Sequence, residues 1–426
     1  MHINEYAAVP TPPPAEKAQP IACPIPNPAP DLMPNSIQDK DRYSRQILFP
    51  GIGAAGQQKL AAAHVAIVGC GATGAAAAAL LARAGVGTLT LVDRDFVEPS
   101  NLQRQMLFDE ADARESLPKA EAARRHIARF NSGVTVYARI ADLVPRNIAE
   151  LLLPQSPQAT GVAPVDIILD ATDNFETRYL INDFAVQQSI PWIYAAAIGA
   201  YAATMNILPA QKPVIPTAGG IEHSPAAYSP TACLACIFPK PPTGNVETCD
   251  TAGILSTAVN LAASIQATET LKFLTGQPHL MRRTLLSFDL WPSAGNASAA
   301  ANGFASPAAN GYLDRSEIAA GVPRPGCQVC GQRVFTHLAG QGRAHITLCG
   351  RDSVQIHEHH RPIDLGAMHR RLAAHADIED VRSNDLLLRF RRGSHTLTLF
   401  ADGRAIVQGT TDITVARSLY SRFIGA

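Results

Sequence analysis

The sequence has no excess charge of either sign and no long apolar run. Its 36 Lys and Arg balance 36 Asp and Glu, which argues against a dominant role in binding nucleic acid or another polyanion. The most apolar stretch, residues 65–91, is mostly Ala and Gly and contains Arg83, so no membrane span is expected. The first 30 residues have neither a basic start nor an unbroken apolar run, so we expect no signal peptide. These absences predict a cytoplasmic protein that binds neither nucleic acid nor membrane.

Composition divides the 426 residues into three parts. Ten prolines fall before Ser36, so residues 1–38 are predicted to form a disordered proline-rich tail, with a docking segment as the alternative. In residues 39–332, short β-branched runs alternate with helical segments, which predicts a Rossmann-like, mostly parallel α/β sheet. Residues 333–426 combine strand-like runs with a closing amphipathic segment and are predicted to form a small α+β domain.

A glycine-rich turn predicts nucleotide binding. Gly69-Cys-Gly71-Ala-Thr-Gly74 follows the β-branched run 64–68 and opens a helical segment. Glycines let the backbone turn tightly and approach a phosphate, whose charge the helix N-terminus favours. Asp93 ends the next strand, where a carboxylate usually accepts hydrogen bonds from a ribose. This pattern alone does not separate NAD-dependent oxidoreductases from enzymes that use ATP.

Three further residues favour ATP. Arg104 lies in the run 100–105, Lys119 follows a proline, and Asp173 lies in the run 172–174 at the end of a later strand. A triphosphate carries roughly four negative charges, so attack on phosphorus by a carboxylate needs nearby cations. Arg104 and Lys119 can supply them, and Asp173 can bind Mg²⁺, whereas hydride transfer needs no such set. The alternative for each residue alone is a surface cation or a helix-capping aspartate.

Two CxxC pairs predict a metal site. They are Cys233-Leu-Ala-Cys236 and Cys327-Gln-Val-Cys330. Four thiolates with this spacing are typical of tetrahedral Zn²⁺. The alternative, a redox-active pair, is disfavoured because neither pair opens a helix directly after a strand. The metal would join a segment rich in Pro and Gly, residues 209–250, to the end of the main domain.

These motifs, in this order, resemble the ThiF/MoeB/HesA family, which is related to ubiquitin-activating enzymes. The resemblance runs from about Asp41 to Cys330 and adds Arg42-Tyr-Ser-Arg45-Gln46 to the motifs above. It implies a homodimeric enzyme that uses Mg-ATP to adenylate the C-terminal glycine carboxylate of a small β-grasp protein. Such a partner is a ubiquitin-like or sulfur-carrier protein, activated for sulfur transfer or for protein conjugation.

The resemblance also implies roles for individual residues. Asp173 corresponds to the Mg²⁺ ligand, and Arg45 to an arginine that reaches into the partner subunit's site. The remaining positions correspond to ATP ligands: Gly69, Gly71, Gly74, Asp93, Asn101, Arg104, Lys119 and Asn174. Arg45, Arg104, Lys119 and Asp173 are therefore the candidate catalytic residues, together with one cysteine.

That cysteine is Cys249, which lies just before a helix expected from about Gly253. Relatives that link covalently to their carrier use a cysteine in this loop, and a helix N-terminus favours a thiolate. A conjugation enzyme would use Cys249 to form a thioester; the alternative is an incidental loop cysteine. No cysteine follows Cys349, so the C-terminal part is not a rhodanese. A non-catalytic scaffold that binds a β-grasp protein, or an NAD-dependent oxidoreductase, are the other classes left open.

Overall fold

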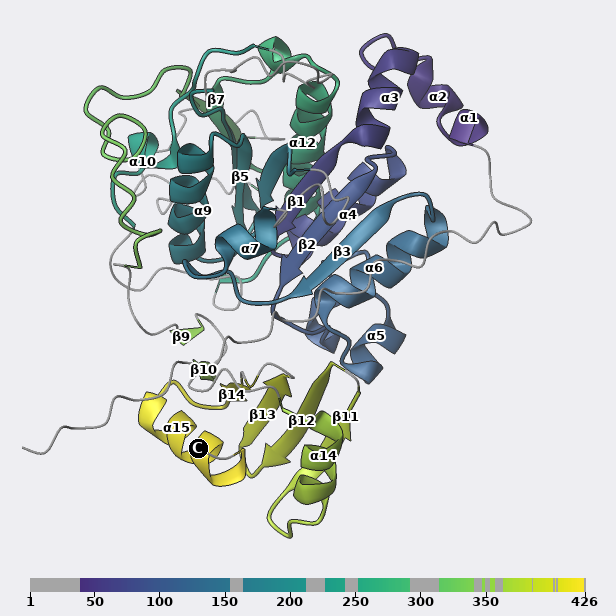
Figure 1. The fold of residues 1–426 in the computed structure, drawn as a ribbon, viewed down its shortest axis with the longest axis vertical. Coiled ribbons are helices and arrows are strands. Elements are labelled where there is room, and N and C mark those ends of the chain that lie inside the picture. Colours follow the sequence, from purple (N-terminus) through teal and green to yellow (C-terminus); the bar gives the residue numbers. More distant parts are fainter. Residues whose placement is uncertain are drawn as a thin grey trace, which may run out of the picture.

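The structure is a computed structural model of the whole chain, and it contains two sheets, each with its own core (Figure 1). It describes residues 39–153, 164–211, 227–241, 252–291, 314–340, 347–348, 353–356, 363–384, 386–400, 403 and 405–424. The predicted proline-rich tail lies outside these residues. Among the helices of the described ranges, none has the length and apolar character needed to cross a membrane.

The larger sheet has eight strands in the order β3-β2-β1-β4-β5-β6-β7-β8. Its parallel strands are β1 (His64–Val68), β2 (Thr88–Asp93), β3 (Thr135–Ile140), β4 (Ile167–Asp170) and β5 (Trp192–Ile198). The antiparallel strands are β6 (Tyr201–Ile207), β7 (Thr284–Asp289) and β8 (Asp314–Ala319). Strand order changes direction between β1 and β4, which is where α/β sheets of this type bind ligands.

Helices cover both faces of this sheet because the residues of β1 alternate between two cores. Val65 and Ile67 pack into one core with α3 (Gly53–Ala62), α4 (Ala72–Arg83), α6 (Lys119–Phe130) and α12 (Ser256–Leu274). Ala66 and Val68 face the other, with α7 (Ile148–Leu152), α9 (Phe175–Gln188) and α10 (Leu234–Ile237). The many alanines of α4 and α12 let these two helices pack closely against each other. The predicted mostly parallel α/β fold is confirmed.

The smaller sheet lies at the C-terminus and is antiparallel, with the order β11-β12-β13-β14-β10-β9. Its strands are β9 (Thr347–Leu348), β10 (Ser353–Ile356), β11 (Glu379–Ser383), β12 (Leu387–Arg392), β13 (His395–Phe400) and β14 (Ala405–Gln408). Two amphipathic helices, α14 (Leu365–Ala373) and α15 (Ile413–Phe423), pack on one face of it. A separate α+β unit was expected here, and the structure contains one.

Candidate active site

The glycine-rich turn joins β1 to α4, and two of its glycines are required by packing. Gly69 has a φ of +90°, and a Cβ there would lie 2.5 Å from the backbone oxygen of Ala171. A Cβ on Gly74 would lie 1.9 Å from the backbone oxygen of Gly69. Gly71 differs, because the nearest atom to an added Cβ is Gln105 Nε2 at 3.9 Å. The fold therefore accounts for Gly69 and Gly74, whereas Gly71 borders open space at the N-terminus of α4.

Asp93 ties this turn to the end of β2. Its carboxylate accepts hydrogen bonds from the backbone N–H of Cys70 at 2.5 Å and from that of Asp95 at 2.6 Å. Burial raises the pKa of the Asp93 carboxyl, and the nearby Lys119 ammonium opposes that rise. Each oxygen keeps a further lone pair for a ligand hydroxyl, which suits the predicted contact with a ribose.

Lys119 is buried rather than a surface lysine, with 3% of the residue exposed. Its Nζ lies 3.1 Å from Asp95 Oδ2, and its backbone N–H donates to the Asp95 carbonyl at 2.9 Å. A lysine is seldom this buried without a specific partner. Lys119 therefore brings a cation close to Asp93 and Asp95, beside the glycine-rich turn.

The segment after η1 (Pro99–Asn101) brings polar side chains up to the turn. Asn101 is buried, and its Oδ1 accepts the Glu98 backbone N–H at 3.1 Å. Over the described ranges, Asn101 Nδ2 and Gln105 Oε1 are buried without a hydrogen-bond partner. Such groups are costly unless a ligand or water pairs with them. Arg104 is half-buried, and its Nη1 donates to the Ser100 carbonyl at 2.8 Å.

The loop after β4 holds Asp173 at the same edge of the sheet. The buried Asp170 carboxylate accepts from the backbone N–H and the hydroxyl of Thr172, at 2.9 and 2.7 Å. Arg178 reaches back from α9, with its Nε 3.3 Å from Asp170 Oδ2 and its Nη2 2.6 Å from the Thr172 carbonyl. This network fixes the loop and leaves Asp173 exposed. The residue that caps α9 is Asn174, whose Oδ1 accepts the Thr177 N–H at 2.8 Å, so capping does not explain Asp173.

Sequence reasoning missed Arg94, the cation that links the ends of β2 and β3. Its Nη1 lies 2.9 Å from Asp142 Oδ1. Burial lowers the pKa of the Arg94 guanidinium, but the carboxylates of Asp142, Asp95, Asp173 and Asp93 together raise it above its ordinary value. The run Asp93-Arg94-Asp95 directly after a strand was the signal available in the sequence.

The four predicted zinc ligands converge. Cys233 and Cys236 lie at α10, and Cys327 and Cys330 lie in the turn after β8. The Sγ distances are 3.8 Å for Cys233–Cys236, 3.6 Å for Cys233–Cys327 and 3.4 Å for Cys236–Cys330. Tetrahedral Zn²⁺ with Zn–S bonds of about 2.3 Å needs sulfur atoms about 3.8 Å apart. The donor set and its spacing therefore fit a structural Zn²⁺.

Comparison with known proteins decides the family. Residues 43–303 match the ThiF family. The chain belongs to the ThiF family. It is 39% identical over 387 residues to the sulfur carrier protein ThiS adenylyltransferase of Bacillus subtilis (strain 168), a match that covers 90% of this chain and 99% of that protein.

One further relative and one solved structure extend the comparison. The adenylyltransferase and sulfurtransferase MOCS3 of Mus musculus is 33% identical over 372 residues, which are 84% of this chain and 70% of that protein. Among solved structures, E. coli MccB with MccA-N7isoASN has a TM-score of 0.51 at 21% identity and covers 70% of this chain and 76% of that one. The likeness to MccB shows a common fold.

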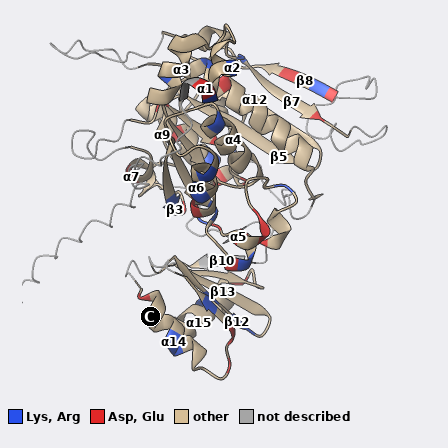
Figure 2. Ribbon diagram, turned by 90° about the vertical axis from the view of Figure 1, so that its right-hand side faces the viewer, with Lys and Arg blue, Asp and Glu red and all other residues tan. Residues whose placement is uncertain are grey.

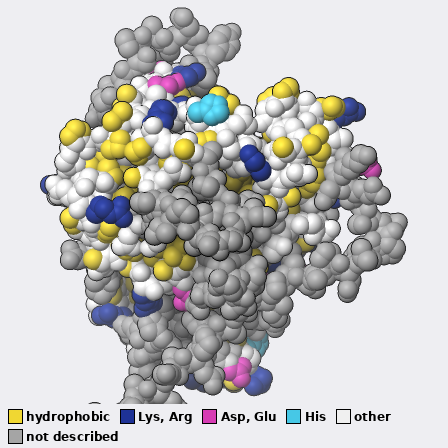
Figure 3. Space-filling view, turned by 45° about the horizontal axis from the view of Figure 1, so that its top comes forward, with side chains coloured by type: hydrophobic (Ala, Val, Ile, Leu, Met, Phe, Trp, Pro, Cys, Tyr) yellow, Lys and Arg dark blue, Asp and Glu magenta, His cyan; other side chains and the backbone are white. Residues whose placement is uncertain are grey.

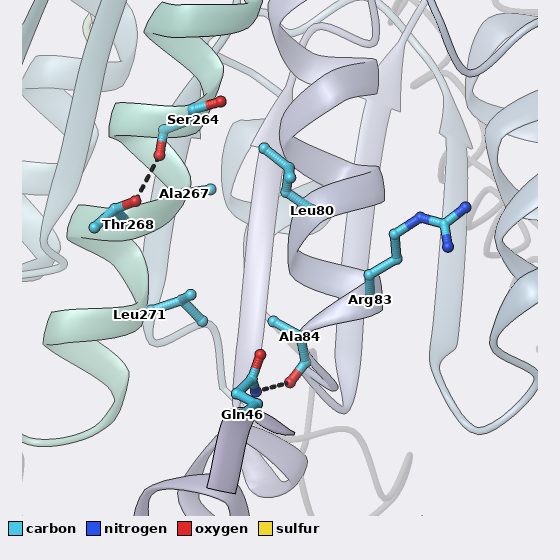
Figure 4. A pocket seen from close by; sticks show the side chains of 8 residues that line it. All are labelled: Gln46, Leu80, Arg83, Ala84, Ser264, Ala267, Thr268 and Leu271. Carbon is cyan, nitrogen blue, oxygen red and sulfur yellow. Dashed lines mark hydrogen bonds between the residues drawn. The ribbon is translucent and has the colours of Figure 1, made fainter. Parts of the chain in front are cut away.

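In this ThiF-family chain, Arg45 lies far from the glycine-rich turn. It is exposed on α2 (Ser44–Ile47), whose Gln46 donates to the carbonyl of Ala84 at 2.7 Å (Figure 4). Ala84 follows the C-terminus of α4, whereas the turn lies at its N-terminus. The 12 residues of α4 place these ends about 18 Å apart. Arg45 is therefore not brought together with the other predicted site residues within one chain.

Cys249 lies outside the described residues, so its predicted role stays a prediction. Downstream of it, α12 begins at Ser256, three residues later than the helix expected from Gly253. Ile254 forms a bridge with Gly199 at the end of β5. The approach to α12 is therefore attached to the sheet and does not extend the helix.

Proposed function

We propose that this chain catalyses ATP-dependent adenylation of the C-terminal glycine carboxylate of a small ubiquitin-like sulfur-carrier protein. The observation that carries the proposal is the buried Lys119 held by Asp95 beside the glycine-rich turn. The names of its relatives, a ThiS adenylyltransferase and an adenylyltransferase and sulfurtransferase, support the same reaction. Family membership also argues against an NAD-dependent oxidoreductase.

In the proposed reaction, a carboxylate oxygen of the carrier attacks the α-phosphorus of ATP. An acyl–phosphate bond forms, the bond to the β-phosphate oxygen breaks, and pyrophosphate leaves with the electron pair. Charge builds up on the phosphate oxygens, and we assign its compensation to Arg104 and Lys119. Asn101 Nδ2, buried without a partner in the described chain, is a suitable donor to the nucleotide, and Asp93 a suitable acceptor for the ribose.

Asp173 is the residue that we propose to hold Mg²⁺. It is an exposed carboxylate, its loop is fixed by Asp170 and Arg178, and Mg²⁺ prefers one or two carboxylates together with phosphate oxygens. The ion would neutralise charge on the triphosphate. We propose separately that Cys233, Cys236, Cys327 and Cys330 hold a structural Zn²⁺, and thiols kept reduced for such a site suit the cytoplasm.

We also propose a homodimer in which Arg45 completes the partner subunit's site. The face around α2 carries large exposed apolar side chains: Leu48 is 71% exposed, Phe49 60% and Leu80 40%. Figure 3 shows hydrophobic side chains on the face at the top of Figure 1, with few acidic ones among them. A pocket of about 300 Å³ between α2, α4 and α12 adds a concave part to this face (Figure 4). Exposed apolar surface of this kind marks protein interfaces.

The fate of the activated carrier has two candidates. The names of both relatives favour sulfur transfer. The alternative is protein conjugation, in which the Cys249 thiolate attacks the carbonyl carbon of the acyl-adenylate, expels AMP and forms a thioester with the carrier. A carrier adduct that a Cys249→Ala variant fails to form would support the covalent role; normal overall transfer by that variant would exclude it.

The test of the proposal is ATP–pyrophosphate exchange with a β-grasp carrier that ends in Gly-Gly. Arg104→Ala and Asp173→Asn should each lower the exchange rate on the order of 10²-fold, because charge on the reacting phosphate is left uncompensated. Arg114→Ala is the matched control, since Arg114 is exposed on α5 (Glu110–Glu115) and pairs only weakly with Glu110 at 3.5 Å.

The carrier provides a second control. The same protein with a C-terminal carboxamide has no carboxylate to activate, so it should support no exchange. Near-normal exchange in both Arg104→Ala and Asp173→Asn would refute the assigned roles. Tight carrier binding without any exchange would instead support the non-catalytic scaffold.

A further inference from the structure

The C-terminal sheet packs its second face against the larger domain next to the nucleotide site. One face of the sheet is covered by α14 and α15, and the other directs Leu387, Phe400 and Ile406 towards Phe96. Phe96 lies between β2 and η1 and is 2% exposed. Both ribbon views place the C-terminal sheet next to α5 (Figures 1 and 2).

The strand register places the contacting side chains on one face of the C-terminal sheet. Arg389, Thr398 and Ile406 form one cross-strand row on β12, β13 and β14, and Leu387 pairs with Phe400. The Arg389 guanidinium lies 5.0 Å from the centre of the Phe96 ring. An aromatic ring enclosed by apolar side chains and a cation is a typical anchor of an interface.

Phe96 is joined through the backbone to Lys119. It forms an antiparallel bridge with Pro118, and the neighbouring Val97 N–H donates to the Leu117 carbonyl at 2.8 Å. On the other side of Phe96, Asp95 holds both the backbone and the ammonium of Lys119. A displacement of Phe96 would therefore move the buried lysine proposed to bind ATP.

A second contact leads to Asn101. Gln408 Nε2, on β14, lies 3.4 Å from Glu98 Oε1. Glu98 and Asn101 cap η1 reciprocally: each side chain accepts the other residue's backbone N–H. The C-terminal sheet thus contacts the 94–101 segment at two residues, each directly coupled to a proposed nucleotide ligand.

We propose that Phe96 is a positioning residue through which the C-terminal sheet holds Lys119 in the geometry that binds ATP, while the contact between Gln408 and Glu98 supports Asn101. The inference rests on the proposed function in naming ATP as the ligand. It assigns the C-terminal domain a role in the first half-reaction, independent of the carrier. Because the coupling is thermodynamic, ATP must in turn favour the docked sheet.

The test uses the full-length protein and compares two arginines of one strand face. Arg389→Met removes the cation over Phe96, whereas Arg391→Met alters an exposed arginine that pairs with Glu379. Phe96→Ala removes the anchor itself. We expect Phe96→Ala to raise both the KM for ATP in pyrophosphate exchange and the Kd for Mg-ATP without carrier about tenfold, with a smaller rise for Arg389→Met. Arg391→Met should match the wild type.

Hydrogen exchange gives a readout that a purely structural contact would not change. Mg-ATP should slow amide exchange in β12 and β13 as well as in residues 94–101, and it should do so less in Arg389→Met than in Arg391→Met. Neither hydrogen exchange nor the Kd for Mg-ATP needs the carrier. Both measurements therefore remain decisive even if the wild type catalyses no pyrophosphate exchange and the proposed function fails. The comparison of Arg389→Met with Arg391→Met also remains decisive if Phe96→Ala does not fold. The inference would be overturned if folded Phe96→Ala and Arg389→Met bind ATP as tightly as the wild type. It would also be overturned if Mg-ATP leaves amide hydrogen exchange in β12 and β13 unchanged.

Discussion

At the scale of single residues, the glycines of the glycine-rich turn meet two different requirements, packing within the fold and access for a phosphate. Gly74 is needed by the fold, because a methyl group there would lie 1.9 Å from a backbone oxygen. Gly71 has a φ of −79°, which other residues adopt, and open space in front of it. A glycine that neither packing nor φ demands is explained by the close approach of a phosphate.

This difference predicts opposite defects for two matched substitutions. Gly74→Ala should lower the free energy of unfolding by about 3 kcal/mol or more, because backbone must shift. Gly71→Ala should cost at most about 1 kcal/mol, the usual loss for alanine at a helix N-cap, yet weaken Mg-ATP binding about tenfold or more. Chemical denaturation and calorimetric ATP titration measure the two effects. Normal ATP affinity in Gly71→Ala would mean that the phosphates bind elsewhere.

Residue-scale prediction from sequence succeeded where a motif carries its own local geometry. The positions of Asp93 at the end of β2 and of the glycines at the start of α4 follow from the strand–turn–helix pattern. Arg94, Arg178 and Phe96 were missed because their importance lies in partners from other strands or from the C-terminal sheet. Burial of Lys119 could not be read from its neighbours in sequence either, since it depends on the Asp95 segment folding over it.

At the scale of elements, the cysteine cluster connects two segments that are far apart in sequence. Cys233 and Cys327 are 94 residues apart, and their sulfur atoms lie 3.6 Å from each other. The Cys233 thiol hydrogen-bonds to Cys236 and lowers the pKa of Cys236, and the Arg324 amide N–H adds a further hydrogen bond. Hydrogen bonds that favour the thiolate of Cys236 suit metal binding, because cysteine binds a metal ion as its thiolate.

We therefore predict about one Zn²⁺ per chain by elemental analysis. Cys327→Ser should lower both the zinc content and the melting temperature, because the site joins α10 to the turn after β8. Cys70→Ala removes a buried cysteine outside the cluster and should keep the full zinc content. Metal-free protein that melts at the same temperature as metal-loaded protein would show that the cluster is not a structural metal site.

Two helices of the larger sheet's domain lie where the sequence predicts them. The sequence pattern predicts one helix over residues 119–130 and another around residues 175–188, and the structure has α6 and α9 there. By contrast, β6 was not predicted, because Tyr201–Ile207 is largely small and polar residues with little strand character. It forms through pairing with β5 and β7 on both sides, which is tertiary context that propensity does not contain.

At the scale of the whole molecule, the proposed homodimer predicts that one chain alone does not complete the site. Arg45 lies at the far end of α4 from the glycine-rich turn, so the catalytic role proposed for it would require a partner subunit. Mixed dimers of Arg45→Ala and Asp173→Asn chains should then regain up to about a quarter of wild-type exchange activity, since half the dimers are mixed and each holds one intact site. Rescue requires subunit exchange, which native mass spectrometry can verify. Mixed dimers without activity, or an active monomer, would contradict the arrangement.

The central claim is that ATP is consumed to form an acyl-adenylate on the carrier's C-terminal carboxylate. The most direct measurement follows isotopically heavy oxygen placed in that carboxylate. Attack by its oxygen on the α-phosphorus, followed by nucleophilic attack at the carbonyl carbon, transfers one heavy oxygen to the released AMP. Mass spectrometry should therefore find labelled AMP together with unlabelled pyrophosphate. Unlabelled AMP, or cleavage of ATP to ADP and phosphate, would contradict the account.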